Sequence, residues 1–278
     1  MNADHGFDTN AQNLDLSVVI PVYNEYKTLP RILRSITKVL PGVAREIILV
    51  DDGSRDGTRE WISATFPADS NHVAGTRQCG DGTIEFSETG GAGFDAVAGP
   101  VVIRPQLQPK NGGKGSALRT GLSLARNEVV VIQDADLEYD PSDWAPMYRL
   151  FQIGAADVVY GSRFYGRPHR ALYFYHYLGN RTISFLFNLL FDQMLTDLET
   201  CYKMFRREVV AGAMLRSNDF GIEVELSAVF ARPRRWRIYE CGISYYGRTY
   251  EEGKKIGWRD GVLALWYILK FRFVQLFR

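Results

Sequence analysis

Residues 129–141 read VVVIQDADLEYDP, and this stretch decides the fold class. Its first four residues are β-branched and form a continuous apolar run, typical of a strand that is buried on both faces. Two similar runs, LSVVIPV at 16–22 and EIILVD at 46–51, occur earlier in the chain, and helical patterns separate the runs. This alternation predicts βαβ units, and therefore an α/β fold with a mostly parallel, Rossmann-like sheet flanked by helices.

Working outward from these runs, the same pattern continues to about residue 161. VVIR at 101–104 and DVVYG at 157–161 predict two more strands, and 25–39 and 115–126 predict helices. Residues 68–100 are glycine-rich without a helical period, so we expect a long insertion there, with a β-hairpin around 80–82. The expected organisation is a polar tail over 1–13, one α/β domain over 14–245 and a basic amphipathic helical segment over 246–278.

The composition excludes several classes of protein. The 278 residues carry 33 Lys and Arg against 32 Asp and Glu, so the net charge of +1 argues against a nucleic-acid partner. The three cysteines, at 79, 201 and 241, form no C-x-x-C pair and fit a reducing compartment. The most apolar stretches, 183–195 and 262–277, contain polar or charged residues, so we expect them to lie on a membrane rather than cross it.

Acidic and aromatic side chains follow three of the predicted strands. In chain order they are Tyr23 and Glu25, with Pro21 near the end of the strand before them, then Asp51 and Asp52, then Asp134, Asp136 and Glu138. Ligands of open α/β sheets bind beyond the carboxyl ends of the strands, so these clusters are expected to meet at one edge. Asp134, Asp136 and Glu138 supply the hard oxygens that suit Mg²⁺ or Mn²⁺, with substrate phosphates completing the coordination. The sequence therefore predicts a divalent cation at this edge.

The segment 107–122, LQPKNGGKGSALRTGL, is glycine-rich and opens a predicted helix. It places Gly113 and Lys114 at the helix start and is similar to a phosphate cradle, in which free backbone N–H groups and a positive helix end bind an anion. The G-x-x-x-x-G-K-[ST] spacing of a P-loop is absent. An ordinary helix start is the alternative interpretation.

Five motifs in order resemble a known family. VVIPVYNE, ILVDDGSRDGT, KNGGKGSALRTGL, QDADLEYDP and VVYGSRF are similar to those of the family 2 glycosyltransferases of GT-A fold. The nearest branch contains dolichyl-phosphate mannosyl- and glucosyltransferases and bacterial polyprenyl-phosphate glycosyltransferases. The resemblance covers about residues 16–250. It implies a metal-dependent, inverting enzyme that transfers one hexose from a nucleotide sugar, of the UDP-glucose or GDP-mannose type, to a polyprenyl phosphate.

The resemblance also implies roles for individual residues. The residues implied to bind the donor are Pro21, Tyr23, Glu25, Asp52, Gly113, Lys114 and Asp134. Those implied to bind Mg²⁺ or Mn²⁺ are Asp134, Asp136 and Glu138. Those implied to take part in catalysis are Asp136, Arg163, Glu225 and Arg248. Lys254 and Lys255 are further candidates to contact phosphate. Processive synthases carry Q-x-x-R-W, whereas here Arg235-Trp236 lacks the glutamine, so transfer of a single sugar is favoured.

The chemistry of the acceptor stays open between two classes. A lipid phosphate is already ionised near pH 7 and needs no general base. A hydroxyl acceptor, on a saccharide or a lipid, needs a carboxylate to take its proton. The candidate bases are Asp197, Glu199, Glu223 and Glu225, of which Glu225 aligns best with the family acid. A third alternative is a nucleotide-sugar-binding protein without turnover.

Basic and aromatic residues are interleaved in two regions. Residues 161–181 hold four arginines and no acid, and 246–278 hold seven Lys or Arg against three Asp or Glu. Such mixtures beside apolar segments suit an anionic headgroup surface. We therefore expect peripheral association with the cytoplasmic face of a membrane, although ordinary helix packing is the alternative.

Overall fold

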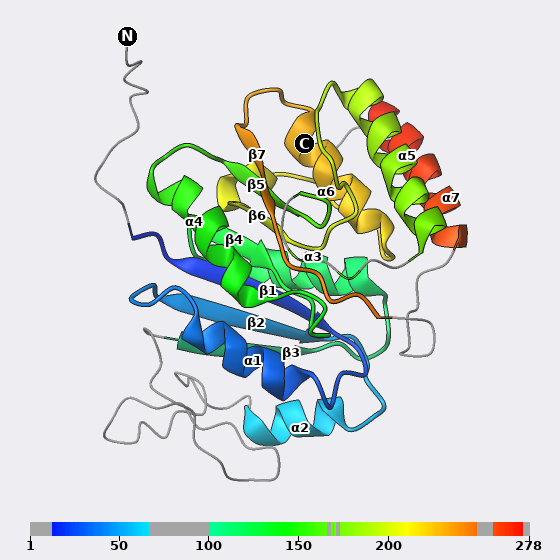
Figure 1. The fold of residues 1–278 in the computed structure, drawn as a ribbon. Helices are drawn as coiled ribbons and strands as arrows, with labels where there is room; N and C mark the ends of the chain where they lie inside the picture. Colours follow the sequence, from blue (N-terminus) through cyan, green and yellow to red (C-terminus); the bar gives the residue numbers. More distant parts are fainter. Residues whose placement is uncertain are drawn as a thin grey trace.

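A seven-stranded sheet forms the centre of the molecule (Figure 1). The structure is a computed structural model that describes residues 13–66, 101–165, 168, 170, 173–248 and 258–274. The strands are β1 Leu16–Val22, β2 Arg45–Asp51, β3 Val101–Leu107, β4 Val129–Ile132, β5 Val158–Ser162, β6 Lys203–Arg206 and β7 Ile238–Gly242. Their order is β3-β2-β1-β4-β6-β5-β7, and only β6 runs antiparallel to its neighbours.

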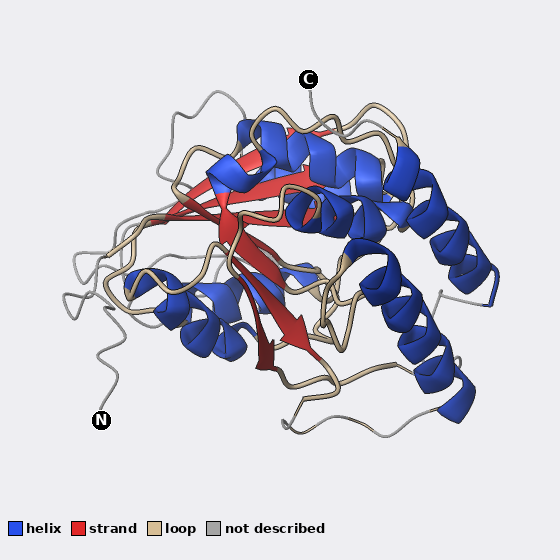
Figure 2. Ribbon diagram, turned by 90° about the horizontal axis from the view of Figure 1, so that it is seen from above, coloured by secondary structure: helices blue, strands red, loops and turns tan. Residues whose placement is uncertain are grey.

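Helices lie on both faces of this sheet (Figure 2). They are α1 Leu29–Lys38, α2 Thr58–Thr65, α3 Lys114–Leu124, α4 Trp144–Gln152, α5 Phe174–Phe191, α6 Gly221–Ala231 and α7 Trp258–Phe273, with short 3₁₀ helices at Pro141–Asp143 and Arg207–Val210. The predicted mostly parallel α/β fold is therefore confirmed. None of the described helices has the length and apolar character that crossing a bilayer requires.

Continuous apolar runs form the core of the sheet, as their sequence predicts. All seven residues of β2 and all four of β4 are buried. Helix α1 covers the sheet through Ile32, Leu33 and Ile36, which are fully buried at helical spacing. Burial on both faces explains why these strands show no polar alternation.

Two strands, β6 and β7, were not predicted from the sequence. Strand β6 has only four residues and lies between β4 and β5, so the sheet is mixed on this side. Strand β7 lies at the edge of the sheet beside β5 and is only partly buried, which leaves it without a strong apolar signal.

Three of the sequence-based expectations lie wholly or mainly outside the described residues. These are the tail at 1–13, of which only residue 13 is described, the insertion at 68–100 with its hairpin, and the roles of Lys254 and Lys255. The expected division into domains stays a prediction.

Candidate active site

One cavity lies beyond the carboxyl ends of β1, β2 and β4. Its volume is about 340 Å³, within the range of ~300–1,000 Å³ that is usual for small-molecule sites. The strand order reverses around β1, which is the place where open α/β sheets bind ligands. Of the twelve site residues named from the sequence, eleven line the cavity: Pro21, Tyr23, Glu25, Asp52, Gly113, Lys114, Asp134, Asp136, Glu138, Arg163 and Arg248.

Asp52 holds the glycine-rich turn against the end of β2. Its two carboxylate oxygens accept hydrogen bonds from the amides of Gly112 and Gly113, each at 2.8 Å. Gly53 lies so close to this turn that a Cβ atom there would come within 2.7 Å of the amide nitrogen of Asn111. Burial raises the pKa of Asp52, and the two amide hydrogen bonds oppose the rise. Asp52 therefore shapes the cavity as well as lining it.

Four backbone amides of the glycine-rich segment are already hydrogen-bonded within the protein, which limits the expected phosphate cradle. Two of them donate to Asp52, and those of Gly115 and Ser116 donate to the carbonyl oxygen of Asn218. These four amides are thus not free to bind a phosphate. The segment also offers the side chain of Lys114 to an anion.

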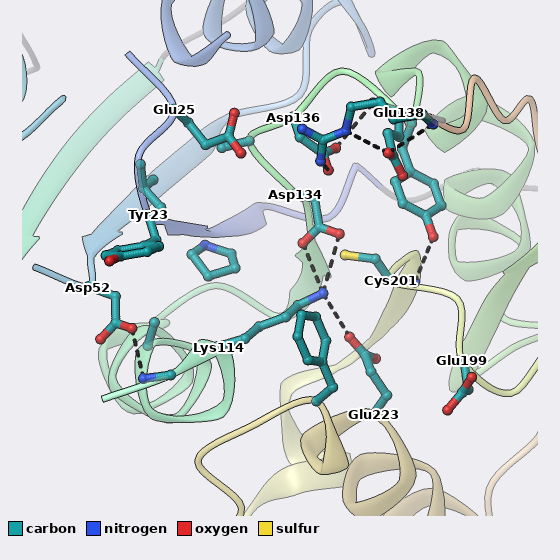
Figure 3. Close-up of a pocket in the computed structure, with 18 of the residues that line it drawn as sticks. Tyr23, Glu25, Asp52, Lys114, Asp134, Asp136, Glu138, Glu199, Cys201 and Glu223 are labelled. Atoms are coloured by element: carbon teal, nitrogen blue, oxygen red, sulfur yellow. Dashed lines mark hydrogen bonds and ion pairs between the residues drawn. The ribbon is translucent and has the colours of Figure 1, made fainter. Parts of the chain in front are cut away.

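Lys114 extends across the cavity to two acidic side chains (Figure 3). Its Nζ lies 3.0 Å from Oδ1 of Asp134 and 3.1 Å from Oε1 of Glu223. Burial alone would lower the pKa of Lys114, but the nearby carboxylates raise it well above its ordinary value. Lys114 therefore stays charged and links the end of β4 to helix α6.

Arg248 pairs with the acidic stretch that follows β4. Its Nη2 lies 2.6 Å from Oδ2 of Asp136, and its Nε lies 2.7 Å from Oε1 of Glu138. The hydroxyl of Tyr245 donates to the other oxygen of Glu138 at 2.9 Å. Burial, together with the charges of Asp134 and Glu138, raises the pKa of Asp136 to about 7, and Arg248 opposes the rise. Negative charge is therefore crowded at this end of the cavity.

The three acids predicted to bind a metal do not gather into one cluster. Within the residues that the structure describes, no three His, Cys, Asp or Glu side chains are arranged to hold a metal ion. Glu138, expected as the third ligand, is instead held by Arg248 and Tyr245. Asp134 and Asp136 both line the cavity and offer two hard carboxylate ligands (Figure 3).

Arg163 reaches the cavity from the end of β5. Its Nε and Nη2 donate to the two oxygens of Asp197, each at 2.7 Å, and Asp197 is fully buried. A bidentate pair of this kind fixes the plane of the guanidinium. Arg163 also stacks over the ring of Tyr245, with 5.2 Å between its Cζ and the ring centroid. The structure therefore presents this cation in a fixed orientation.

Glu225, which aligned best with the family acid, lies outside the cavity. It is completely buried, and its oxygens accept hydrogen bonds from the amides of Arg216 and Ser217, each at 2.8 Å. Two residues along a helix point about 200° apart, because each residue turns by about 100°. Of the pair in α6, only Glu223 can therefore face the cavity. Glu225 instead holds the loop that caps α3, and we correct its expected catalytic role accordingly.

Several lining residues were not singled out from the sequence as site residues. They are Asn111, Tyr139, Cys201, Phe220 and Tyr245. Asn111 and Tyr139 lie within the KNGGKGSALRTGL and QDADLEYDP motifs, but their contacts depend on how the segments fold together. Glu199 and Glu223 also line the cavity; the sequence offered them only as alternative bases.

A comparison with protein-family models decides the family. Residues 17–77 and 98–212 match the model described as glycosyl transferase family 2. This chain belongs to glycosyl transferase family 2. As a member of that family it is a glycosyltransferase, which agrees with the expectation from the motifs. The matched residues contain β1 to β6 and most of the residues that line the cavity.

Solved structures similar to this family 2 glycosyltransferase confirm its GT-A fold. Glucosyl-3-phosphoglycerate synthase from Mycobacterium tuberculosis, in complex with Mn²⁺, uridine diphosphate and phosphoglyceric acid, is 18% identical with a TM-score of 0.61. The similarity covers 94% of this chain and 80% of that one. The same protein in complex with Mg²⁺ and uridine diphosphate is also 18% identical, with a TM-score of 0.60 and the same coverage.

Proposed function

We propose that this glycosyltransferase moves a single hexose from a nucleotide sugar, of the UDP-glucose or GDP-mannose type, to an acceptor carried by a membrane lipid. The observation that supports the donor is the single cavity where Asp52, Lys114 and Asp134 meet two arginines from distant parts of the chain. The similar solved protein binds uridine diphosphate and UDP-glucose. The polyprenyl phosphate implied by the sequence resemblance stays one of two proposed acceptors; a hydroxyl is the other.

The charge of the cavity supports a requirement for a divalent cation. Seven carboxylates line the cavity against three cationic side chains. A nucleotide sugar brings further negative charge on its diphosphate, so it cannot bind favourably unless cations compensate for both. Asp134 and Asp136 fit an Mg²⁺ or Mn²⁺ ion, because such ions use one or two carboxylates and the substrate's phosphates. When bound, the ion would neutralise the charge of the departing diphosphate.

The residues of this chain supply the remaining requirements of the displacement. We propose that Tyr23, Glu25 and Asp52 bind the nucleoside at the ends of β1 and β2. Arg163, fixed by Asp197, and Arg248 then face the diphosphate, where preorganised cations stabilise charge that develops as the sugar bond breaks. Positioning of donor and acceptor in one enclosed cavity supplies much of the rate.

The surface of α5 and α7 supports a membrane location. These two helices pack side by side (Figure 1) and expose eleven large apolar side chains: Phe174, Tyr175, Tyr177, Leu178, Phe185 and Leu189 on α5, and Val262, Leu263, Trp266, Leu269 and Phe273 on α7. We call this set the outer helical surface. The two helices carry four basic residues and one acid, which complements anionic lipid headgroups. We propose that an anionic membrane covers this surface.

Ligand-induced stabilisation tests the proposed donor. Selective stabilisation by one of a panel of UDP- and GDP-sugars, in the presence of Mn²⁺ or Mg²⁺, is expected, because a ligand that binds only the folded state raises the melting temperature. The Asp136→Ala variant should lose turnover of that donor. Turnover that persists in this variant would overturn the assigned site. A bound donor that is never consumed by the wild type would instead indicate a binding protein.

A further inference from the structure

Four carboxylates were candidates for the base that a hydroxyl acceptor needs. In the structure, three of them form hydrogen bonds or ion pairs with other residues. Asp197 holds Arg163 through both oxygens, and Glu225 binds two loop amides. Glu223 lies 2.5 Å from Nζ of Lys203 and 3.1 Å from Nζ of Lys114. Each of these three carboxylates would have to give up a cation or a hydrogen-bond donor before it could contact a substrate hydroxyl.

Glu199 is the fourth candidate and differs from the others. It forms no hydrogen bond or ion pair with another residue among those the structure describes, and it lines the cavity (Figure 3). It lies in the segment between α5 and β6, whose backbone is fixed by Glu240: one oxygen of that carboxylate accepts from the amides of Thr196 at 2.8 Å and Asp197 at 3.3 Å. A free carboxylate on a fixed backbone is suited to exchange a proton with a bound substrate.

Glu199 also marks the junction of the cavity with a smaller pocket. This side pocket, of about 50 Å³, lies between the start of α6 and helix α7 and shares Glu199, Phe220 and Glu223 with the main cavity. Leu263 of α7 lines it and also belongs to the outer helical surface. Gly221 leaves room for the ring of Tyr267, which a Cβ atom at this position would contact. The side pocket therefore lies between residues of the reaction site and the outer helical surface.

The side pocket is acidic. Its lining includes Glu199, Asp219, Glu223 and Asp260, and no lysine or arginine among the described residues. A lipid phosphate that entered here would have to pass Glu199 and Asp219, and the side chain of Asp219 contacts only the amide of Gly221 and the hydroxyl of Tyr267 among the described residues. Like charges in a partly desolvated pocket repel. A neutral hydroxyl meets no such barrier and can donate a hydrogen bond to a carboxylate.

We propose that Glu199 is the general base of this enzyme, and that the acceptor is a lipid-borne hydroxyl which enters through the side pocket. This inference rests on the proposed function. In the step, the acceptor oxygen forms a bond with the anomeric carbon of the donor while the bond from that carbon to the nucleoside diphosphate breaks. The leaving diphosphate keeps the electron pair, and the hydroxyl proton passes to the carboxylate of Glu199.

The surroundings of Glu199 suit this role. Burial, together with the charges of Asp197 and Glu223, raises the pKa of Glu199 to about 7, and the charges of Arg163 and Lys203 oppose the rise. Asp219 and Asp260 face the same side pocket. A base whose pKa lies near the working pH combines a sizeable ionised fraction with good affinity for the proton.

The Glu199→Gln variant tests the proposal. The probes are the nucleotide sugar that stabilises the protein and phosphatidylglycerol vesicles that contain either diacylglycerol or undecaprenyl phosphate. The wild type should label diacylglycerol, and its kcat/KM should rise with pH, with the midpoint of the rise at about pH 7 and a plateau above it. The variant should lose about 10²- to 10⁴-fold in rate and the rising limb of this profile, while its affinity for the donor should not fall. Glu199→Asp should recover part of the rate.

Controls and contrary results separate this inference from the proposed function. Glu128→Gln, an exposed acid that pairs with Arg206, is the matched control and should behave like the wild type. Labelling of undecaprenyl phosphate alone, with Glu199→Gln at the wild-type rate, would overturn the inference and leave the proposed function standing. If neither lipid is labelled, the hydrolysis of the donor by water is measured instead. A hydrolysis rate and pH profile of Glu199→Gln equal to those of the wild type would overturn the inference. Lack of binding of any nucleotide sugar would overturn the proposed function itself.

Discussion

The carboxylate of Glu199 has a consequence for stability that is independent of activity. Its pKa is about 7 in the folded protein against an ordinary value of 4.5. A carboxyl group whose pKa is raised by folding favours the fold when protonated, so stability falls as pH rises from the unfolded pKa to the folded one. At 1.36 kcal/mol per unit, ionised Glu199 costs at most about 3 kcal/mol above pH 7.

Glu199→Gln should therefore stabilise the protein at pH 8 and change little at pH 4. The glutamine is neutral at both values, so the variant avoids the cost of a buried charge. Denaturant unfolding at a series of pH values measures the difference, with Glu128→Gln as the control. Equal free energies of unfolding for the variant and the wild type at pH 8 would show that Glu199 is well solvated.

At the residue scale the sequence predicted which side chains meet but not how they are paired. Motif order and strand ends placed Asp52, Asp134 and Asp136 correctly around one cavity. The exclusion of Glu225 depends on how α6 is rotated, and an E-x-E pair in a helix gives no sign of which acid faces inward. Pairing of Arg248 with Asp136 joins positions 112 residues apart, which no local pattern reveals.

At the element scale, the start of α3 depends on the close approach of two backbones. A Cβ atom at Gly115 would contact the carbonyl oxygen of Ser217 and come within 2.9 Å of the carbonyl carbon of Asn218. Both atoms belong to backbone that cannot rotate away as a side chain can. The loop that contains them is also the one held by Glu225. This close approach explains why Gly115, in the glycine-rich segment 107–122, has no side chain.

Gly115→Ala should lower the free energy of unfolding by about 1–3 kcal/mol, as overpacked sites usually do. Because the loop must move, the affinity for the nucleotide sugar should fall as well. Gly179→Ala on α5 is a suitable control, since nothing lies within 4 Å of its Cβ position. Thermal unfolding with and without the donor measures both effects. If Gly115→Ala were as stable as the wild type, the close approach of the two backbones would not contribute to the stability of the fold.

The outer helical surface leads to a prediction about α5. Phe185 and Leu189 are each 68% exposed and lie one helical turn apart, so they share one face. Replacing both with serine should weaken binding to phosphatidylglycerol vesicles at least tenfold, because each side chain contributes up to about 1.5–3 kcal/mol when buried in lipid.

The stability of this double variant should stay close to that of the wild type, because exposed side chains contribute little to the folded state. Co-sedimentation with vesicles measures binding. Leu124→Ser, an exposed leucine at the end of α3, controls for a general loss of apolar surface. Undiminished binding of the Phe185→Ser, Leu189→Ser variant would mean that a membrane does not cover this part of α5.

At the scale of the whole molecule, topology explains what could and could not be predicted. The apolar runs predicted β1 to β5, and the acids at the strand ends predicted that a site forms at one edge of the sheet; the order of the strands comes only from the structure. The insertion of β6 between β4 and β5 could not be predicted, because a four-residue strand carries no periodic signal and its pairing is long-range. The same insertion brings the segment with Asp197 and Glu199 to the cavity.

The charge of the molecule is unevenly distributed, and this leads to a last prediction. The chain as a whole has a net charge of +1, yet seven carboxylates oppose three cations in the cavity. Removal of divalent ions with EDTA should therefore weaken donor binding by the wild type at least tenfold. At ~6 Å, two unit charges interact by about 3 kcal/mol at an effective dielectric constant of 20, which is ample for such an effect.

Asp136→Asn removes one of these negative charges and leaves Arg248 with Glu138 as its remaining ion-pair partner. This variant should bind the donor more tightly than the wild type when EDTA is present, and more weakly when Mn²⁺ is present. Equilibrium dialysis under both conditions measures this reversal, with Glu128→Gln again as the control. Opposite effects under the two conditions would show that Asp136 binds the cation. If Asp136 only stabilised the fold, its loss would weaken donor binding under both conditions.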